Sequence, residues 1–369
     1  MDPRIANIAR IMVEHSLRVE PKQRVHIGCW PFSPRALPYL QAITRAVLKA
    51  GAYPLLDLEP EFLDTMLLKE GNDDQLAFID PRLMMMARDW ERSIVLICEE
   101  NTRRNSGIDP KRQAYRSQFF KEYFDVSLKR SAEGDFRWVL TNIPTPGYAQ
   151  DADMSLEDFE DFFFHSTFAD TEDPIAAWQE VYREHEKLVA WLAGKRDVVV
   201  KGENIDLKLS IEGRPFINCY GDSNLPDGEI FTSPVEDSVE GWVRFTYPAI
   251  YQGREFAGVE LRFEKGRVVK ATAEKNQDYL DSILDIDAGA RTLGEFAIGT
   301  NRNINRFVKN ITFDEKLHGT VHMALGFGYP ESGSKNESSI HWDMICDMTG
   351  GGQILVDGEL FYDSGDFKL

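Results

Sequence analysis

Three of the seven histidines in the sequence lie close together in its C-terminal half, at His318, His322 and His341. His341 and Asp343 are separated by one residue, and side chains two positions apart on a β-strand lie on the same face. The intervening Trp342 would then point to the opposite, apolar face. Imidazole and carboxylate groups at this spacing are typical ligands of zinc, cobalt or manganese, although a solvent-exposed strand face has the same pattern.

Two glutamates are further candidate ligands, because each follows a glycine that permits a tight turn and close backbone approach. Glu229 follows Gly228, and Glu295 follows Gly294. Together with two histidines and an aspartate they make five potential ligands. Five ligands are more than one tetrahedral zinc ion uses. They are fewer than two separate ions need, unless the two ions share carboxylates.

The sequence around these positions resembles that of a known family. Four segments are similar, in this order, to segments of the aminopeptidase T / aminopeptidase S family of thermophilic-type metallo-aminopeptidases, and they span residues 226–247, 289–301, 313–330 and 336–347. The resemblance is strong over residues 205–369 and looser over the N-terminal half. It implies a dimeric exopeptidase that holds two divalent ions, zinc or cobalt with manganese as a further possibility, and that releases N-terminal residues from peptides.

The resemblance also implies roles for individual side chains. The implied metal ligands are Glu229, Glu295, His322, His341 and Asp343. Tyr329 is the implied active-site tyrosine, which would donate its hydroxyl to the oxyanion of the tetrahedral intermediate. Glu295 is expected to orient or deprotonate the attacking water, but Glu229 could do so if Glu295 only bridges the ions. His318 has no ligand counterpart in the family, and its spacing predicts a place on the same strand face as His322.

The N-terminal half must be built differently, because short apolar runs alternate there with helical patterns. This order predicts a parallel sheet with strands at 25–29, 53–58, 93–98 and 138–141, and a helix at 33–50 that starts at Ser33 and stops at Gly51. Further helices are expected at 156–163 and 174–192, with His185 packed in the core. The sequence contains neither GxGxxG nor GxxxxGK[ST], so no nucleotide is indicated. We expect an N-terminal three-layer α/β domain with a mostly parallel sheet over residues 1–195.

From residue 198 the pattern changes to short alternating segments with glycine turns, which is typical of antiparallel strands. The expected strands are 198–201, 206–211, 216–219, 242–247, 255–263 and 268–274. Gly213, Gly266 and the glycines at 350–352 are expected to turn hairpins, and one helix is expected at about 277–293. The predicted C-terminal domain, residues 196–369, is therefore α+β, mainly antiparallel and β-rich, and carries the metals.

Composition excludes some partners. The 61 acidic residues exceed the 42 basic ones, and the resulting net charge of −19 repels nucleic acid and anionic lipid but suits metal ions and substrates with a free amino group. No apolar run is long enough to span a membrane, and no signal peptide is evident. The four cysteines lie far apart and are expected to be buried reduced thiols.

We therefore expect a cytoplasmic metallo-aminopeptidase, a homodimer that acts on peptides with a free N-terminus and binds neither nucleic acid nor membrane. The N-terminal domain is expected to supply pocket walls and dimer contacts rather than chemistry. Two alternatives stay open: a metal-dependent hydrolase acting on an amide other than a peptide, and a non-catalytic binding protein on the same fold.

Overall fold

The computed structural model describes residues 2–369, and the chain divides into two compact units. The first contains the chain up to Trp178 together with Gly221–Asp227, and the second contains Gln179–Tyr220 and Gly228–Leu369. The division falls inside helix α10 (Pro174–Leu192), ahead of the boundary expected after residue 195. Most of this helix groups with the second unit because Leu188 and Leu192 are part of that unit's apolar core.

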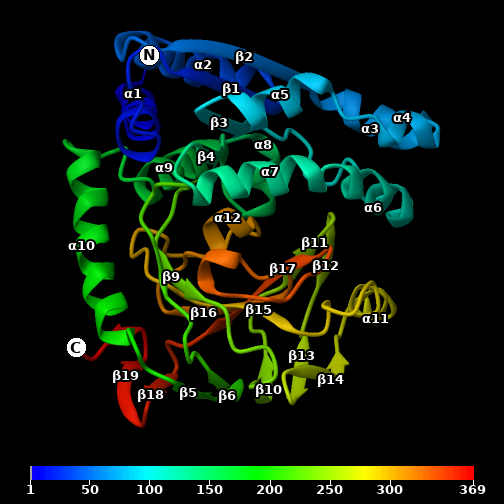
Figure 1. The fold of residues 1–369 in the computed structure, drawn as a ribbon, viewed down its shortest axis with the longest axis vertical. Coiled ribbons are helices and arrows are strands. Elements are labelled where there is room, and N and C mark those ends of the chain that lie inside the picture. The colour runs from blue at the N-terminus through cyan, green and yellow to red at the C-terminus, as the bar shows by residue number, and fades with distance from the viewer. Residues whose placement is uncertain (1) are drawn as a thin grey trace. The chain divides into compact units, whose positions relative to one another are not determined.

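The first unit is built on a parallel sheet with the strand order β2-β1-β3-β4-β8, as the sequence pattern predicts. Its strands are β1 (Arg24–Phe32), β2 (Tyr53–Pro60), β3 (Arg92–Ile97), β4 (Arg137–Asn142) and β8 (Asn224–Leu225). The helices that accompany them are α1 (Pro3–Arg10), α2 (Leu37–Lys49), α3 (Glu61–Glu70), α4 (Asp73–Ala77), α5 (Pro81–Asp89), α6 (Pro110–Phe119), α7 (Lys121–Ala132), α8 (Pro146–Asp151) and α9 (Leu156–Ser166). Figure 1 shows this unit from blue through green.

Local signals at the start and end of α2 act as expected. The Ser33 hydroxyl accepts a hydrogen bond from the backbone N–H of Arg35, at the start of a 3₁₀ turn (Pro34–Ala36) that leads into the helix. Gly51 ends it in the left-handed region, with φ of 75°. No helix that the structure describes has the length and apolar character needed to cross a membrane.

The second unit contains two larger antiparallel sheets and one small one. The eight-stranded sheet has the order β14-β13-β10-β6-β5-β18-β19-β20, the five-stranded sheet has the order β17-β16-β15-β9-β7, and β11 pairs with β12. Their bounds are β5 (Asp197–Gly202), β6 (Ile205–Ser210), β7 (Ile217–Cys219), β9 (Glu229–Thr232), β10 (Glu240–Arg244), β11 (Ala249–Tyr251), β12 (Arg254–Phe256), β13 (Glu260–Glu264), β14 (Arg267–Thr272), β15 (Leu293–Gly299), β16 (Thr320–Gly326), β17 (His341–Asp347), β18 (Gln353–Val356), β19 (Glu359–Asp363) and β20 (Asp366–Phe367). One apolar core contains buried residues from both larger sheets.

Several expectations for this unit need correction. The helix predicted at 277–293 is α11 (Gln277–Leu284), because Asp287 accepts hydrogen bonds from the N–H groups of Gly289 and Ala290 and so forms a turn before β15. A second short helix is α12 (Ile311–Asp314). The strand predicted at 255–263 is divided into β12 and β13, with Gly258 between them at φ of 59°.

The glycine turns differ in what they connect. Gly266 turns the β13–β14 hairpin, as expected. Gly213 and the glycines at 350–352 lie instead between strands of different sheets, so these turns carry the chain from one layer to the other. No disulfide links the cysteines that the structure describes, and Cys219 is only half-buried whereas the other three are buried.

Candidate metal centre

Four neighbouring strands of the five-stranded sheet hold the predicted ligands on one face. Glu229 begins β9, Glu295 lies in β15, His322 lies in β16, and His341 and Asp343 lie in β17. The strand registers place all five ligands on the same side of the sheet. Ala324 pairs with both Glu295 and Asp343, Ala297 pairs with His322, and Gly299 pairs with Glu229. The residues that alternate with them, including Phe296, Met323 and Trp342, lie in the apolar core. The alternation of side chains along the strands therefore places the candidate ligands on one face of the sheet and the core residues on the other.

Small residues leave room for this cluster. Ala324 lies between Glu295 and Asp343 in the row across the three strands, so no large side chain separates the two carboxylates. Gly228 has φ of 118°, and a Cβ there would come within 2.8 Å of the Asn301 Cβ. Only glycine suits this backbone, which directs the chain into Glu229.

The distances between ligand atoms make Glu295 the centre of the group. His322 Nε2 lies 3.2 Å from Glu295 Oε1 and 3.0 Å from Glu229 Oε2. His341 Nε2 lies 3.6 Å from Glu295 Oε2 and 3.3 Å from Asp343 Oδ2. One three-residue group, Glu229, Glu295 and His322, therefore shares Glu295 with a second group, Glu295, His341 and Asp343.

The structure adds two residues that the sequence analysis did not select. The Glu315 carboxylate lies close to His322 and Asp343 and forms a third possible ligand group with them. The Lys316 ammonium lies 2.5 Å from Glu229 Oε1 and 2.9 Å from Glu315 Oε1. The signal that the sequence offers is Gly319, which lies in the turn between these residues and β16 with a φ of 89°.

Other polar residues near the histidine window lie outside the cluster. His318 is in the turn before β16 and not on the strand, so the expectation that it shares a face with His322 is wrong. Asp314 is buried and accepts hydrogen bonds from the N–H groups of Val308 and Asn310. It therefore shapes the loop rather than the cluster.

His185 is a packed core residue, as its helical spacing indicates. Its Nδ1 lies 2.8 Å from Asn218 Oδ1 and its Nε2 lies 2.8 Å from Thr300 Oγ1. Burial lowers the pKa of His185 to about 4, so the imidazole is neutral at neutral pH. Both ring nitrogens already have partners, which leaves none for a metal.

Tyr329 lies between β16 and a 3₁₀ turn (Pro330–Ser332), beside the cluster. Its ring centroid is 5.2 Å from that of His341 and 5.7 Å from that of Phe231. Burial, with the charge of nearby Glu295, raises the pKa of Tyr329 well above its ordinary value, so its hydroxyl stays protonated at neutral pH. No residue that the structure describes forms a hydrogen bond with this hydroxyl, and it can donate to another group.

Opposite charges control the ionisation of the cluster. Burial alone would raise the pKa of Glu229, but Lys316 and His322 lower it to about 2. Burial raises the pKa of Glu295. Burial would lower the pKa of His341, but the charge of Asp343 raises it to about 10. Because a ligand imidazole must be neutral, metal binding would release protons from this cluster.

The residues present fit a divalent metal ion. Asp343 Oδ1 is buried and forms no hydrogen bond with any residue that the structure describes, and Glu229 Oε2 has the imidazole of His322 within ion-pair distance at 3.0 Å. Buried carboxylate oxygens without such partners are costly unless a cation compensates them. Carboxylate oxygens together with imidazole nitrogens are a donor set for zinc, cobalt or manganese.

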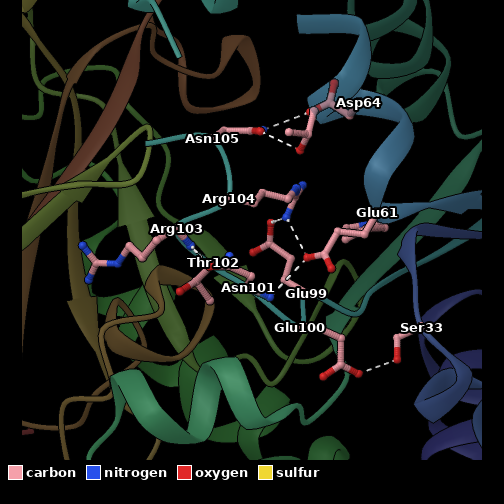
Figure 2. Close-up of polar contacts among 12 residues, drawn as sticks. Ser33, Glu61, Asp64, Glu99, Glu100, Asn101, Thr102, Arg103, Arg104 and Asn105 are labelled. Atoms are coloured by element: carbon pink, nitrogen blue, oxygen red, sulfur yellow. Dashed lines mark hydrogen bonds and ion pairs between the residues drawn. The ribbon is translucent and has the colours of Figure 1, made fainter. Parts of the chain in front are cut away.

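The first unit has a polar cluster of a different kind, shown in Figure 2. The Arg104 guanidinium forms ion pairs with Glu61 and Glu99, and Ser33 donates a hydrogen bond to Glu100. The carboxylates are paired with arginine and no histidine is among the labelled residues. Over residues 2–369, no group of possible metal ligands lies wholly within this unit. The cluster therefore fits a structural ion-pair network better than a metal site.

Comparisons with known proteins identify the family to which the chain is similar. A model of the family described as "Thermophilic metalloprotease (M29)" matches residues 1–367. The chain is 27% identical to Aminopeptidase 2 of Geobacillus stearothermophilus, over 95% of this chain and 92% of the relative. It is 30% identical to Aminopeptidase T of Thermus thermophilus, over 70% of each chain. The fold is similar to that of the solved structure titled "Wild-type AmpT from Thermus thermophilus", with a TM-score of 0.86 over 99% of each chain at 23% sequence identity.

Proposed function

The chain belongs to the thermophilic metalloprotease (M29) family and is a metal-dependent aminopeptidase, and we propose that it binds two divalent ions on the polar face of the five-stranded sheet. The proposed ligands are Glu229, Glu295, His322, His341 and Asp343, with Glu315 as a sixth. The observation that carries this proposal is the position of Glu295, whose two oxygens lie toward two different histidines. A carboxylate shared in this way allows a small ligand set to serve two ions.

Peptides with a free N-terminus are the substrates, and the proposed chemistry assigns one task to each side chain. Bound divalent ions supply Lewis acidity and lower the pKa of a water molecule from about 15.7 to about 7. Glu295 orients or deprotonates the attacking water. Glu229 suits this task less, because its ion pair with Lys316 stabilises the ionised form and makes it a weak base. Tyr329 donates its hydroxyl to the oxyanion.

Zinc or cobalt is the proposed native metal, with manganese as a further candidate, since these ions accept mixed imidazole and carboxylate ligands. We expect the purified enzyme to hydrolyse aminoacyl-coumarin amides, to lose more than about 95% of this activity after chelation, and to regain it with zinc or cobalt, because the ions supply the activated water. N-terminally acetylated amides are the matched control and should not be cleaved. Activity that survives complete removal of metal, measured by elemental analysis, would contradict the proposed centre.

We also propose that the enzyme is a homodimer assembled through β2 and α3. Strand β2 is an edge of its sheet, and seven large apolar side chains from these two elements are 39% to 61% exposed: Tyr53, Leu55, Leu56, Leu58, Phe62, Leu63 and Met66. If each contributes about half of the area of a large apolar side chain, they offer roughly 600 Å² per subunit. This approaches the roughly 800 Å² per partner that stable interfaces bury. We propose that these seven side chains pack against the same side chains of a second copy of the chain.

Light scattering tests this assembly. The wild-type chain should have twice the 42.2 kDa mass of one subunit at micromolar concentration, and Leu56→Glu should reduce it to a monomer because a buried unpaired carboxylate opposes association. Val269→Glu is a suitable control, since Val269 is 51% exposed in the second unit. A wild-type monomer with full specific activity would rule the dimer out.

Cytoplasmic location completes the proposal and is supported by the unbridged cysteines, which suit a reducing compartment. The N-terminal unit is proposed to contribute subunit contacts. Membership of this family does not favour the two alternatives, a hydrolase of non-peptide amides and a non-catalytic binding protein.

A further inference from the structure

Lys316 is the one lysine or arginine in the cluster of carboxylates and imidazoles that the structure describes, and it is almost completely buried. Its side chain is 1% exposed, whereas lysines are rarely buried unless they are paired. Its backbone is held on both sides, because its N–H donates to Phe313 O and its carbonyl accepts from Asn301 N–H, each at 3.0 Å. The ammonium is therefore carried into the cluster by a fixed segment and not by a mobile surface chain.

The ammonium forms ion pairs with two carboxylates that lie beside His322. It lies 2.5 Å from Glu229 Oε1 and 2.9 Å from Glu315 Oε1, so each of these carboxylates keeps one oxygen for another partner. Glu229 Oε2 is the oxygen that lies toward His322. Lys316 thus limits Glu229 and Glu315 to one ligand oxygen each.

The other part of the cluster has no such restriction. The second ligand group consists of Glu295, His341 and Asp343. No lysine or arginine that the structure describes forms an ion pair with these three side chains. The two halves of the centre therefore differ in charge, because the positive charge of the ammonium offsets one of the carboxylates beside His322. A buried positive charge repels a divalent ion strongly, since little solvent screens the interaction.

We propose that Lys316 makes the metal centre asymmetric, so that the ion bound by Glu229, Glu295 and His322 is held more weakly than the ion bound by Glu295, His341 and Asp343. This inference rests on the proposed function, because it presupposes two ions at these ligands. Lys316 acts as a positioning residue, since it touches ligand carboxylates and not the reacting atoms. The consequence is one resident ion and one exchangeable ion.

Calorimetric titration of cobalt into the chelator-treated full-length protein tests the proposal. We expect two classes of site in the wild-type protein whose Kd values differ by at least ~10-fold. Lys316→Met should tighten the weaker site by at least ~10-fold and leave the tighter site within about 2-fold, because only the nearby repulsive charge is removed. Lys270→Met, a change of the same charge at an exposed position on β14, should alter neither site.

Two further variants separate charge from shape. Lys316→Gln keeps a hydrogen-bond donor without the charge and should behave like Lys316→Met, which preserves the test if methionine disrupts folding. Lys316→Arg keeps the charge and should keep the weak site. Equal affinities in the wild-type protein, or an unchanged or weakened second site in Lys316→Gln, would overturn the asymmetry. Absence of stoichiometric cobalt binding to the wild-type protein would instead count against the proposed metal centre itself.

Discussion

Replacing Glu295 with glutamine should remove most of the bound metal and reduce kcat/KM by at least ~10³-fold, which corresponds to about 4 kcal/mol of lost transition-state stabilisation. Glu295 is the carboxylate shared by the two ligand groups, so its loss affects both proposed ions at once. An amide oxygen keeps the size of the side chain but neither the charge nor the basicity of the carboxylate. Elemental analysis of the purified variant and kinetics on an aminoacyl amide measure the two effects.

A control variant tests whether the effect of Glu295→Gln is specific to this position. Glu337→Gln makes the same chemical change at an exposed position near β17 and should keep both metal and activity. His318→Ala should also keep its metal, because His318 lies in a turn outside the cluster. Full metal content in Glu295→Gln would remove the bridging role, and full metal content in both His322→Ala and His341→Ala would remove the ligand assignment as a whole.

Tyr329→Phe should lower kcat by roughly 10²–10³ while the metal content stays unchanged, as expected for the loss of one oxyanion donor. The substitution removes only the hydroxyl, and the ring keeps its contacts with Phe231 and His341. Stability and KM should therefore change little, so that the loss is confined to the transition state. Steady-state kinetics at saturating metal, together with thermal unfolding, provide the measurement.

A purely structural role for Tyr329 gives a different result. If the ring only packs the turn before Pro330, phenylalanine should work nearly as well as tyrosine, and only Tyr329→Ala should be harmful through lost burial. Tyr247→Phe is a suitable control, because Tyr247 is also half-buried and stacks on Phe307. Retention of more than about half of the wild-type kcat by Tyr329→Phe would mean that the hydroxyl contributes under ~0.5 kcal/mol, and the oxyanion role would be wrong.

Features that depend on neighbouring residues could be predicted from the sequence. The strand period alone places His341 and Asp343 on one face with Trp342 on the other, and the pairing of β16 with β17 agrees. Ser33 and Gly51 mark the ends of the segment that contains α2, because capping and left-handed backbone are local properties. The parallel and antiparallel character of the two halves also follows from local alternation of strand and helix patterns.

The meeting of distant residues could not be predicted from local pattern. Glu229 and Glu295 come together because β9 pairs with β15, and strand pairing over such a separation depends on the packing of the whole sheet. The same reason explains why Gly213 joins two sheets and does not turn a hairpin.

Charge balance inside the centre was decided only by the tertiary structure. Glu315 and Lys316 lie in a loop with no helical or strand period, so no pattern shows which way their side chains point. Backbone hydrogen bonds of Lys316 with Phe313 and Asn301 hold this loop in place, and the Lys316 ammonium reaches Glu229. The sequence by itself therefore determined the polar strand face and its candidate ligands, whereas three-dimensional packing decided which charges surround them. The physical reason is that strand periodicity acts over two residues, whereas burial and ion pairing depend on every segment that folds against the site.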